Sequence, residues 1–125
     1  MSKPSNPLAF IIEDDDKLAA IFSRAVNLAG FDVQVIKDGQ QAIQILGESV
    51  PTIVILDLHL PGATGDKVLA CIRADDRLQK TIAVLATSDS LTADFLRDQC
   101  DYVLLKPVSF GQLQDLATRL RTTIK

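Results

Sequence analysis

The sequence is poor in several residue types that mark large classes of protein. It has no tryptophan, one tyrosine, one histidine and two cysteines among its 125 residues. The cysteines, Cys71 and Cys100, lack metal-ligand spacing and lie in apolar surroundings. We therefore expect two buried free thiols in a protein of a reducing compartment.

Basic residues and long apolar runs are also scarce. The 13 lysines and arginines are outnumbered by 16 acidic residues, which gives a net charge of −3. This balance supplies no basic footprint, so we expect no direct binding of nucleic acid or of an anionic membrane surface. No stretch reaches the ~18 apolar residues of a membrane helix, and the N-terminus lacks the apolar core of a signal peptide. We expect a cytoplasmic protein without membrane insertion.

The chain does contain enough apolar sequence for one folded domain. Its residues are 47% hydrophobic and 23% charged, which is typical of globular proteins, and the length fits a single core. The first residues, MSKPSNP, are polar and carry two prolines. We therefore expect a flexible leader over residues 1–7 and a single domain over residues 8–125.

Short apolar runs alternate with amphipathic ones along this domain. Runs of strand length lie at 8–12, 32–37, 52–56, 82–86 and 102–105. Helical spacing follows each run: over 16–29, from Asp38, around 68–72, near 90–98 and from Ser109. This alternation with short links predicts parallel βαβ units, that is, an α/β fold with a doubly wound sheet.

The second expected strand differs from the others. Residues 32–37 (DVQVIK) alternate polar and apolar side chains, whereas the first, third and fourth runs are continuously apolar. Continuous runs are typical of strands covered on both faces, and alternation is typical of an exposed edge. We therefore expect a five-stranded parallel sheet of order 2-1-3-4-5, a flavodoxin-like (βα)5 fold with helices on both faces.

Polar residues follow the buried runs at the points where the strands end. Ligands of open parallel sheets bind outside the carboxyl ends of the strands, near the switch in strand order. In the order 2-1-3-4-5, the first, third, fourth and fifth strands are neighbours. We therefore expect one site formed by five residues: Glu13, Asp14, Asp57, Thr87 and Lys106.

The charges of this set indicate its chemistry. Three carboxylates close together repel one another, and a single lysine leaves the group two charges short of neutrality. A divalent ion would restore the balance, and oxygen ligands favour Mg²⁺, with Mn²⁺ possible. A lysine and a hydroxyl beside an ionised aspartate suit phosphoryl transfer to that aspartate.

Simpler interpretations exist for each residue taken alone. Asp15 or Asp16 should cap the following helix, where carboxylates meet free N–H groups. Lys106 could be a solvated lysine at a strand end, and Thr87 a strand residue with a locally satisfied hydroxyl. These explanations would all have to hold at matched ends of adjacent strands, which favours the common site.

The motifs resemble those of the receiver domain of two-component response regulators, over residues 8 to about 122. FIIEDDDKLA is similar to the acidic pair after the first strand of that family, and ILDLHLPGATG to its third-strand signature. VLATS and LLKP supply the threonine and the lysine-proline pair. The resemblance implies that Asp57 accepts a phosphoryl group from the phosphohistidine of a sensor histidine kinase or a histidine phosphotransfer protein. Phosphorylation would then switch contacts with a downstream protein target.

The resemblance also implies roles for single residues. Asp14, Asp57 and the backbone carbonyl of His59 would hold Mg²⁺, with Glu13 acting through water. The side chains of His59, which we expect to be exposed, and Asp89 would tune the lifetime of the phosphoryl group. Thr87 would act as the switch residue. The resemblance also favours a cis Lys106–Pro107 bond, which lets the lysine turn back toward the acids.

One departure affects the expected switch. Val103 stands three residues before the lysine, where the family usually has an aromatic, and Tyr102 lies one place early. Side chains alternate along a strand, so Tyr102 cannot replace that aromatic and should be a packing or partner-contact residue. We expect the phosphorylation chemistry to be unaffected and the signal relay through Val103 to be altered.

The sequence also bears on three other functions. A flavodoxin binding FMN would need a phosphate loop where four consecutive acids stand. An aspartyl-phosphate hydrolase using Asp14 would want threonine or valine where Leu18 lies. A receiver-like interaction module that is not phosphorylated remains as an alternative. For the phosphorylated receiver and for the unphosphorylated receiver-like module alike, we expect a signalling module rather than a turnover enzyme.

Overall fold

The structure is a computed structural model that describes residues 6–124. The leader expected over residues 1–7 falls mostly outside the described residues. Its last residue is held by the sheet, because the Asp32 amide donates to the Pro7 carbonyl at 2.9 Å.

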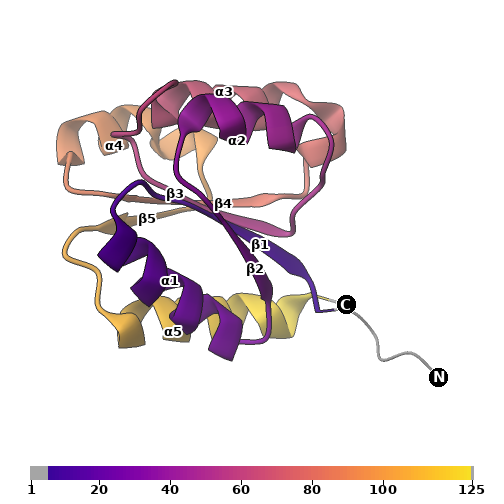
Figure 1. Cartoon of the computed structure of the whole chain (residues 1–125), viewed down its shortest axis with the longest axis vertical. Coiled ribbons are helices and arrows are strands. Elements are labelled where there is room, and N and C mark those ends of the chain that lie inside the picture. Colours follow the sequence, from indigo (N-terminus) through magenta and orange to yellow (C-terminus); the bar gives the residue numbers. More distant parts are fainter. Residues whose placement is uncertain (1–5, 125) are drawn as a thin grey trace.

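The described chain alternates strands and helices as expected (Figure 1). The strands are β1 (Leu8–Ile12), β2 (Asp32–Ile36), β3 (Ile53–Leu56), β4 (Ile82–Thr87) and β5 (Tyr102–Leu105). The helices are α1 (Asp16–Leu28), α2 (Gly39–Leu46), α3 (Gly65–Ala74), α4 (Ser90–Leu96) and α5 (Phe110–Thr123). Two short 3₁₀ turns, η1 (Asp76–Leu78) and η2 (Arg97–Gln99), follow α3 and α4.

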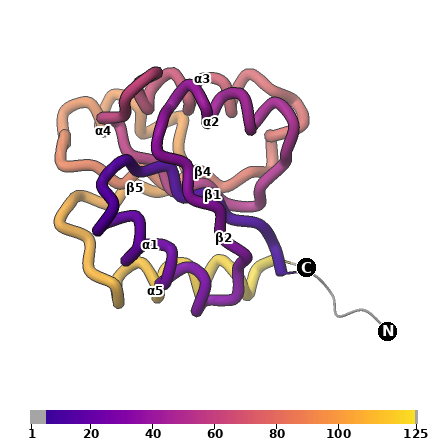
Figure 2. Tube along the Cα trace, in the orientation of Figure 1, coloured from indigo at the N-terminus to yellow at the C-terminus, as the bar shows by residue number. Residues whose placement is uncertain are grey.

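The sheet has the order β2-β1-β3-β4-β5, and all pairs are parallel. The predicted doubly wound, flavodoxin-like topology is therefore confirmed, with β2 at one edge. Helices α1 and α5 cover one face, and α2, α3 and α4 cover the other (Figures 1 and 2). No helix within residues 6–124 combines the length and apolarity needed to span a bilayer.

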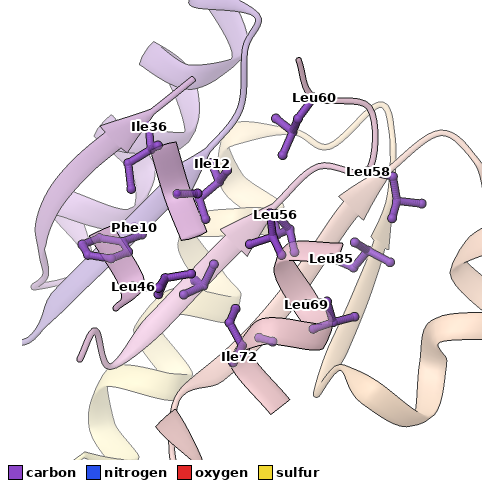
Figure 3. Close-up of a cluster of buried hydrophobic side chains, with 14 of the residues drawn as sticks. Phe10, Ile12, Ile36, Leu46, Leu56, Leu58, Leu60, Leu69, Ile72 and Leu85 are labelled. Atoms are coloured by element: carbon purple, nitrogen blue, oxygen red, sulfur yellow. The ribbon is translucent and has the colours of Figure 1, made fainter. Parts of the chain in front are cut away.

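Alternating side chains of the buried strands divide the core into two layers. Phe10 and Ile12 point toward α2 and α3, together with Leu56 and Leu85 (Figure 3). Ala9 and Ile11 point the other way and pack against α1 and α5. Burial on both faces explains why β1, β3 and β4 read as continuous apolar runs.

Side-chain caps start three of the helices where the sequence predicts them. The Asp15 carboxylate accepts from the Leu18 amide at 3.0 Å and caps α1. The Asp38 carboxylate and the Ser109 hydroxyl accept in the same way at the starts of α2 and α5. These caps fix where each loop from a strand end turns into its helix.

The prediction of two buried thiols is wrong. Cys71 is exposed, because Val68, Leu69 and Ile72 occupy the buried face of α3 and leave position 71 toward solvent. Cys100 is half-buried, and its Sγ lies 3.4 Å from the Leu96 carbonyl oxygen. Burial raises the pKa of the Cys100 thiol.

Candidate functional site

The candidate site lies at the carboxyl ends of four adjacent strands. The Asp57 amide donates to the Ile12 carbonyl at 3.1 Å, which aligns the ends of β3 and β1. The Lys106 amide donates to the Thr87 carbonyl at 2.9 Å, which aligns the ends of β5 and β4. Parallel pairing thus gathers residues that are far apart in the sequence.

Three carboxylates form the acidic cluster, which we define as Glu13, Asp14 and Asp57. One carboxylate oxygen from each lies within 4.8 Å of the others. Glu13 and Asp57 are only 2% and 6% exposed, whereas Asp14 is exposed. These hard oxygen donors, converging from two strand ends with one side open, fit the ligand preference of Mg²⁺.

Lys106 supplies the positive charge of the site. Its Nζ lies 2.7 Å from Glu13 Oε1 and 3.4 Å from Asp57 Oδ2. The Lys106–Pro107 bond is cis, as expected. The ammonium therefore neutralises one carboxylate charge and leaves the cluster with two negative charges to be balanced.

Burial and pairing act in opposite directions on the titration of this pair. Burial raises the pKa of the Glu13 carboxyl, although the hydrogen bond from Lys106 offsets part of the effect. Burial also disfavours the charged form of Lys106. The hydrogen bond to Glu13 and the charges of Asp57 and Glu13 outweigh it and raise the pKa of the lysine. Lys106 is thus held as an ammonium ion.

A close backbone contact fixes the position of Asp57. A β-carbon at Gly65 would lie 2.1 Å from the Asp57 carbonyl oxygen, so only glycine fits at the start of α3. The Gly65 amide donates to the Leu58 carbonyl at 2.8 Å, and Asp57 Oδ1 accepts from the Leu58 amide at 2.8 Å. The contact holds α3 against the end of β3 and orients the Asp57 carboxylate.

The loop after β3 is also tied to α2. The Gly39 amide donates to the Pro61 carbonyl at 2.8 Å. Gly62 has a φ of +81°, where a side chain is disfavoured and where a β-carbon would meet the Asp38 carboxylate. The loop that carries His59 is therefore held at both of its ends.

Thr87 ends β4, and Asp89 lies in the short loop between β4 and α4. Thr87 is fully buried, and its Oγ1 accepts from the Asp89 amide at 3.1 Å. Asp89 caps α4, accepting from the Thr92 amide at 3.0 Å and from the Thr92 hydroxyl at 2.8 Å. These hydrogen bonds lower the pKa of the Asp89 carboxyl.

His59 reaches across to this second loop. Its side chain is exposed, as expected, and Nε2 lies 3.7 Å from Asp89 Oδ2. The family resemblance implied that both side chains tune the lifetime of the phosphoryl group, but the sequence did not predict their contact. Nor did it predict the α4 cap, although the Asp89-Ser-Leu-Thr92 spacing carries that signal.

Val103 and Tyr102 lie on opposite faces of β5. Val103 is half-buried against the layer that contains α2, α3 and α4, whereas Tyr102 is 42% exposed. A hollow of about 260 Å³ adjoins them and is also lined by Arg97, Cys100 and Asp101. This hollow therefore lies at the start of β5.

The fold and the cluster together define a flavodoxin-like domain with an acidic, lysine-containing site at the ends of its strands. The family profile of the response regulator receiver domain matches residues 9–118. The chain therefore belongs to the receiver domain family of two-component signalling, a family of signalling modules.

Curated relatives support this assignment. The chain is 31% identical over 118 residues to the probable methanogenesis regulatory protein FilR2 of Methanothrix harundinacea, covering 86% of this chain and 76% of that protein. It is 32% identical to the DNA-binding response regulator MtrA of Mycolicibacterium smegmatis, covering 92% of this chain and 49% of MtrA. The chain thus spans about half the length of MtrA.

Solved structures agree with the fold. The signal receiver domain of a putative Luxo repressor protein from Vibrio parahaemolyticus superposes with a TM-score of 0.81 at 26% identity, covering 94% of this chain and 92% of that one. The receiver domain of sensor histidine kinase PA1611 from Pseudomonas aeruginosa, solved with magnesium in its active-site cleft, gives 0.82 at 21% identity, covering 94% and 99%.

Proposed function

We propose that this chain is a phosphoacceptor receiver, phosphorylated on Asp57 and folded as one domain over residues 8–125. The observation that carries the proposal is the Lys106 ammonium 3.4 Å from Asp57 Oδ2, in a cluster whose other carboxylates come from the end of β1. This arrangement provides a nucleophile and a positive charge for the oxygens of an incoming phosphoryl group.

In the proposed step, a carboxylate oxygen of Asp57 attacks the phosphorus of a phosphohistidine. A phosphorus–oxygen bond forms, the phosphorus–nitrogen bond breaks, and the departing imidazole takes up a proton. Lys106 stabilises charge on the phosphoryl oxygens. The buried Thr87 hydroxyl, at the end of the adjacent strand β4, would donate a hydrogen bond to the phosphoryl group.

Asp14, Asp57 and the backbone carbonyl of His59 would hold Mg²⁺, with Glu13 contributing through water. When bound there, the ion would offset the negative charge shared by Asp57 and the incoming phosphoryl group. The direct Glu13–Lys106 hydrogen bond of 2.7 Å supports an outer position for Glu13, because one of its oxygens is already engaged.

The proposed partners are a sensor histidine kinase or a histidine phosphotransfer protein, and a downstream protein target in the cytoplasm. The side chains of His59 and Asp89, which approach each other, would set how readily water attacks the acyl phosphate. MtrA is a DNA-binding response regulator, but it is about twice as long as this chain. We therefore propose no direct nucleic-acid contact for this chain.

A receiver-like interaction module without phosphorylation is the second candidate. Such a module would keep the fold and bind its partner proteins without phosphorylation of Asp57. The burial of Glu13 and Asp57 against Lys106 favours the phosphoacceptor, since burying carboxylates costs free energy that an interaction module would not need to bear.

Intact mass after incubation with acetyl phosphate tests the proposal. We expect one added phosphoryl group with Mg²⁺ and none with EDTA. Asp57→Asn should abolish the addition, Asp14→Ala should weaken metal binding, and Asp66→Asn, on the exposed first turn of α3, should change neither. Phosphorylation of the Asp57→Asn variant, or phosphorylation that ignores EDTA, would exclude this assignment.

A further inference from the structure

One edge of the sheet is open along β2. In the described part of the chain, β2 pairs only with β1. The Asp32 amide donates to the Pro7 carbonyl at 2.9 Å, and the Ile36 carbonyl accepts from the Glu13 amide at 3.0 Å. In a parallel ladder every second residue turns its backbone groups to the same neighbour, so Gln34 also faces β1. The N–H and C=O groups of Val33 and Val35 therefore point outward.

A groove lies beside this free edge on the α1 side. It encloses about 640 Å³, and we call it the edge groove. Its lining residues are Ala20, Ser23, Arg24, Asn27, Val33 and Val35. Val33 is half-buried against the α1–α5 layer, and Val35 is 38% exposed, so the floor next to the free backbone groups is apolar.

Two polar groups in the edge groove lack partners. The Ser23 hydroxyl oxygen is buried and makes no hydrogen bond in the structure. Exposed Arg24 forms no ion pair or hydrogen bond with any residue within 6–124. By contrast Lys37, just beyond β2, is paired with Asp16. A free guanidinium beside an apolar floor matches a ligand that carries a carboxylate and apolar side chains.

We propose that the β2 edge and the edge groove bind an extended segment of a partner protein, in which apolar residues alternate along the strand and one acidic side chain reaches Arg24. The segment adds a strand to the sheet through the outward groups of Val33 and Val35. Its alternate side chains lie on the valine floor and under α1. The proposal is independent of phosphorylation at Asp57.

A second copy of this chain fits the groove less well. Antiparallel pairing of two β2 strands about Gln34 would set Val33 of one copy opposite Val35 of the other. It would also bring both Arg24 side chains into one shared groove, where like charges repel. An acidic segment would instead be attracted to Arg24. Charge therefore favours an acidic partner segment over a second copy of this chain.

The probe is a peptide of eight residues, blocked at both ends, with glutamate and two valines at alternate positions and serine or threonine between them. Titrated into the ¹⁵N-labelled full chain, it should give saturable shifts that are largest at the Val33 and Val35 amides. Hydrogen exchange at those two amides should slow. N-methylation of the peptide groups that face β2 should abolish binding, and methylation of the outward groups should not.

Charge reversal provides the matched test. Arg24→Glu should weaken binding of the glutamate peptide about ten-fold and strengthen binding of the same peptide with lysine at that position. Gln34→Lys, whose side chain lies on the other face of β2, should leave the affinity nearly unchanged. Absence of saturable shifts at Val33 and Val35, or equal affinity of the Arg24→Glu variant, would overturn the proposal. Protection of these amides by self-association without peptide would also overturn it, in favour of a second copy.

Discussion

At the scale of single residues, the pairing of Glu13 with Lys106 determines how the site responds to pH. A carboxylate that is 2% exposed and hydrogen-bonded at 2.7 Å has little access to water as an alternative partner. Removal of the lysine therefore leaves a buried charge without compensation, a more severe loss than that of an exposed ion pair.

We expect Lys106→Met to lower the free energy of unfolding by about 2–3 kcal/mol near neutral pH in the presence of EDTA. Burial already raises the pKa of Glu13, and loss of the lysine hydrogen bond raises it further. An acid whose pKa is raised by folding destabilises the folded state as pH rises through that pKa, so the deficit should shrink on acidification.

Urea unfolding at several pH values, with a ¹³C titration of the Glu13 carboxyl, measures both effects. Lys67→Met, which removes an exposed lysine on α3, is the matched control and should be nearly neutral. A deficit that is equally large at every pH would show that Glu13 is not the group left uncompensated.

At the scale of elements, the strand ends and helix starts are joined by contacts that leave little room. Gly65 and Gly111 both lie in first turns of helices, but their surroundings differ. A β-carbon at Gly65 would lie 2.1 Å from the Asp57 carbonyl oxygen, whereas one at Gly111 would meet nothing within 4 Å. Alanine substitutions at these two glycines therefore distinguish the effect of helix propensity from the effect of the close contact between α3 and β3.

We expect Gly65→Ala to cost at least about 2 kcal/mol, because the start of α3 must move away from the acceptor strand. Gly111→Ala should stabilise by up to about 1 kcal/mol through helix propensity alone. Chemical denaturation of both variants measures the difference. Equal effects would mean that the contact between α3 and β3 relaxes without cost.

Arg73 joins three elements at the opposite end of the sheet. Its guanidinium donates to the carbonyls of Gln99 and Thr81 at 2.6 and 3.2 Å and to the Asp101 carboxylate at 2.8 Å. Asp101 in turn accepts from the Ala83 amide at 2.8 Å. The end of α3 is thus tied to the starts of β4 and β5.

Arg73→Met should therefore destabilise by about 2 kcal/mol, since the partly buried carbonyls of Gln99 and Thr81 lose their donor. Arg97→Met removes an exposed pair with Asp94 and should cost less than about 0.5 kcal/mol. Thermal and urea unfolding compare the two variants. A similar small loss for both would mean that solvent replaces the Arg73 contacts.

At the scale of the whole molecule, patterns that depend on the sheet were predictable from the sequence, and contacts between loops were not. Alternating and continuous runs gave the strand order, and strand order alone brought Asp57 and Lys106 together. The His59–Asp89 approach depends on the paths of two loops, which no periodicity encodes. Cys71 was misassigned because its apolar surroundings were considered without its angular position on α3, which Val68 and Ile72 define.

The valine at position 103 determines what we expect of signal transmission through the molecule. In typical receivers an aromatic at the position of Val103 moves inward when the threonine binds the phosphoryl group. Valine has one dominant rotamer and sweeps a smaller volume. It is also a smaller obstacle than an aromatic ring, so the loop after β4 can rearrange without displacing a ring.

We therefore expect phosphorylation to reorder residues 87–91 and 58–64 and to shift the surface of β5 and α5 only modestly. Amide and methyl NMR shifts with and without beryllofluoride and Mg²⁺ measure both regions in one experiment, and the Asp57→Asn variant gives the baseline. Tyr102, 42% exposed on the other face of β5, should show little change. Shifts at Val103 and α5 as large as those at residues 87–91 would contradict this expectation and show that the relay operates without its aromatic.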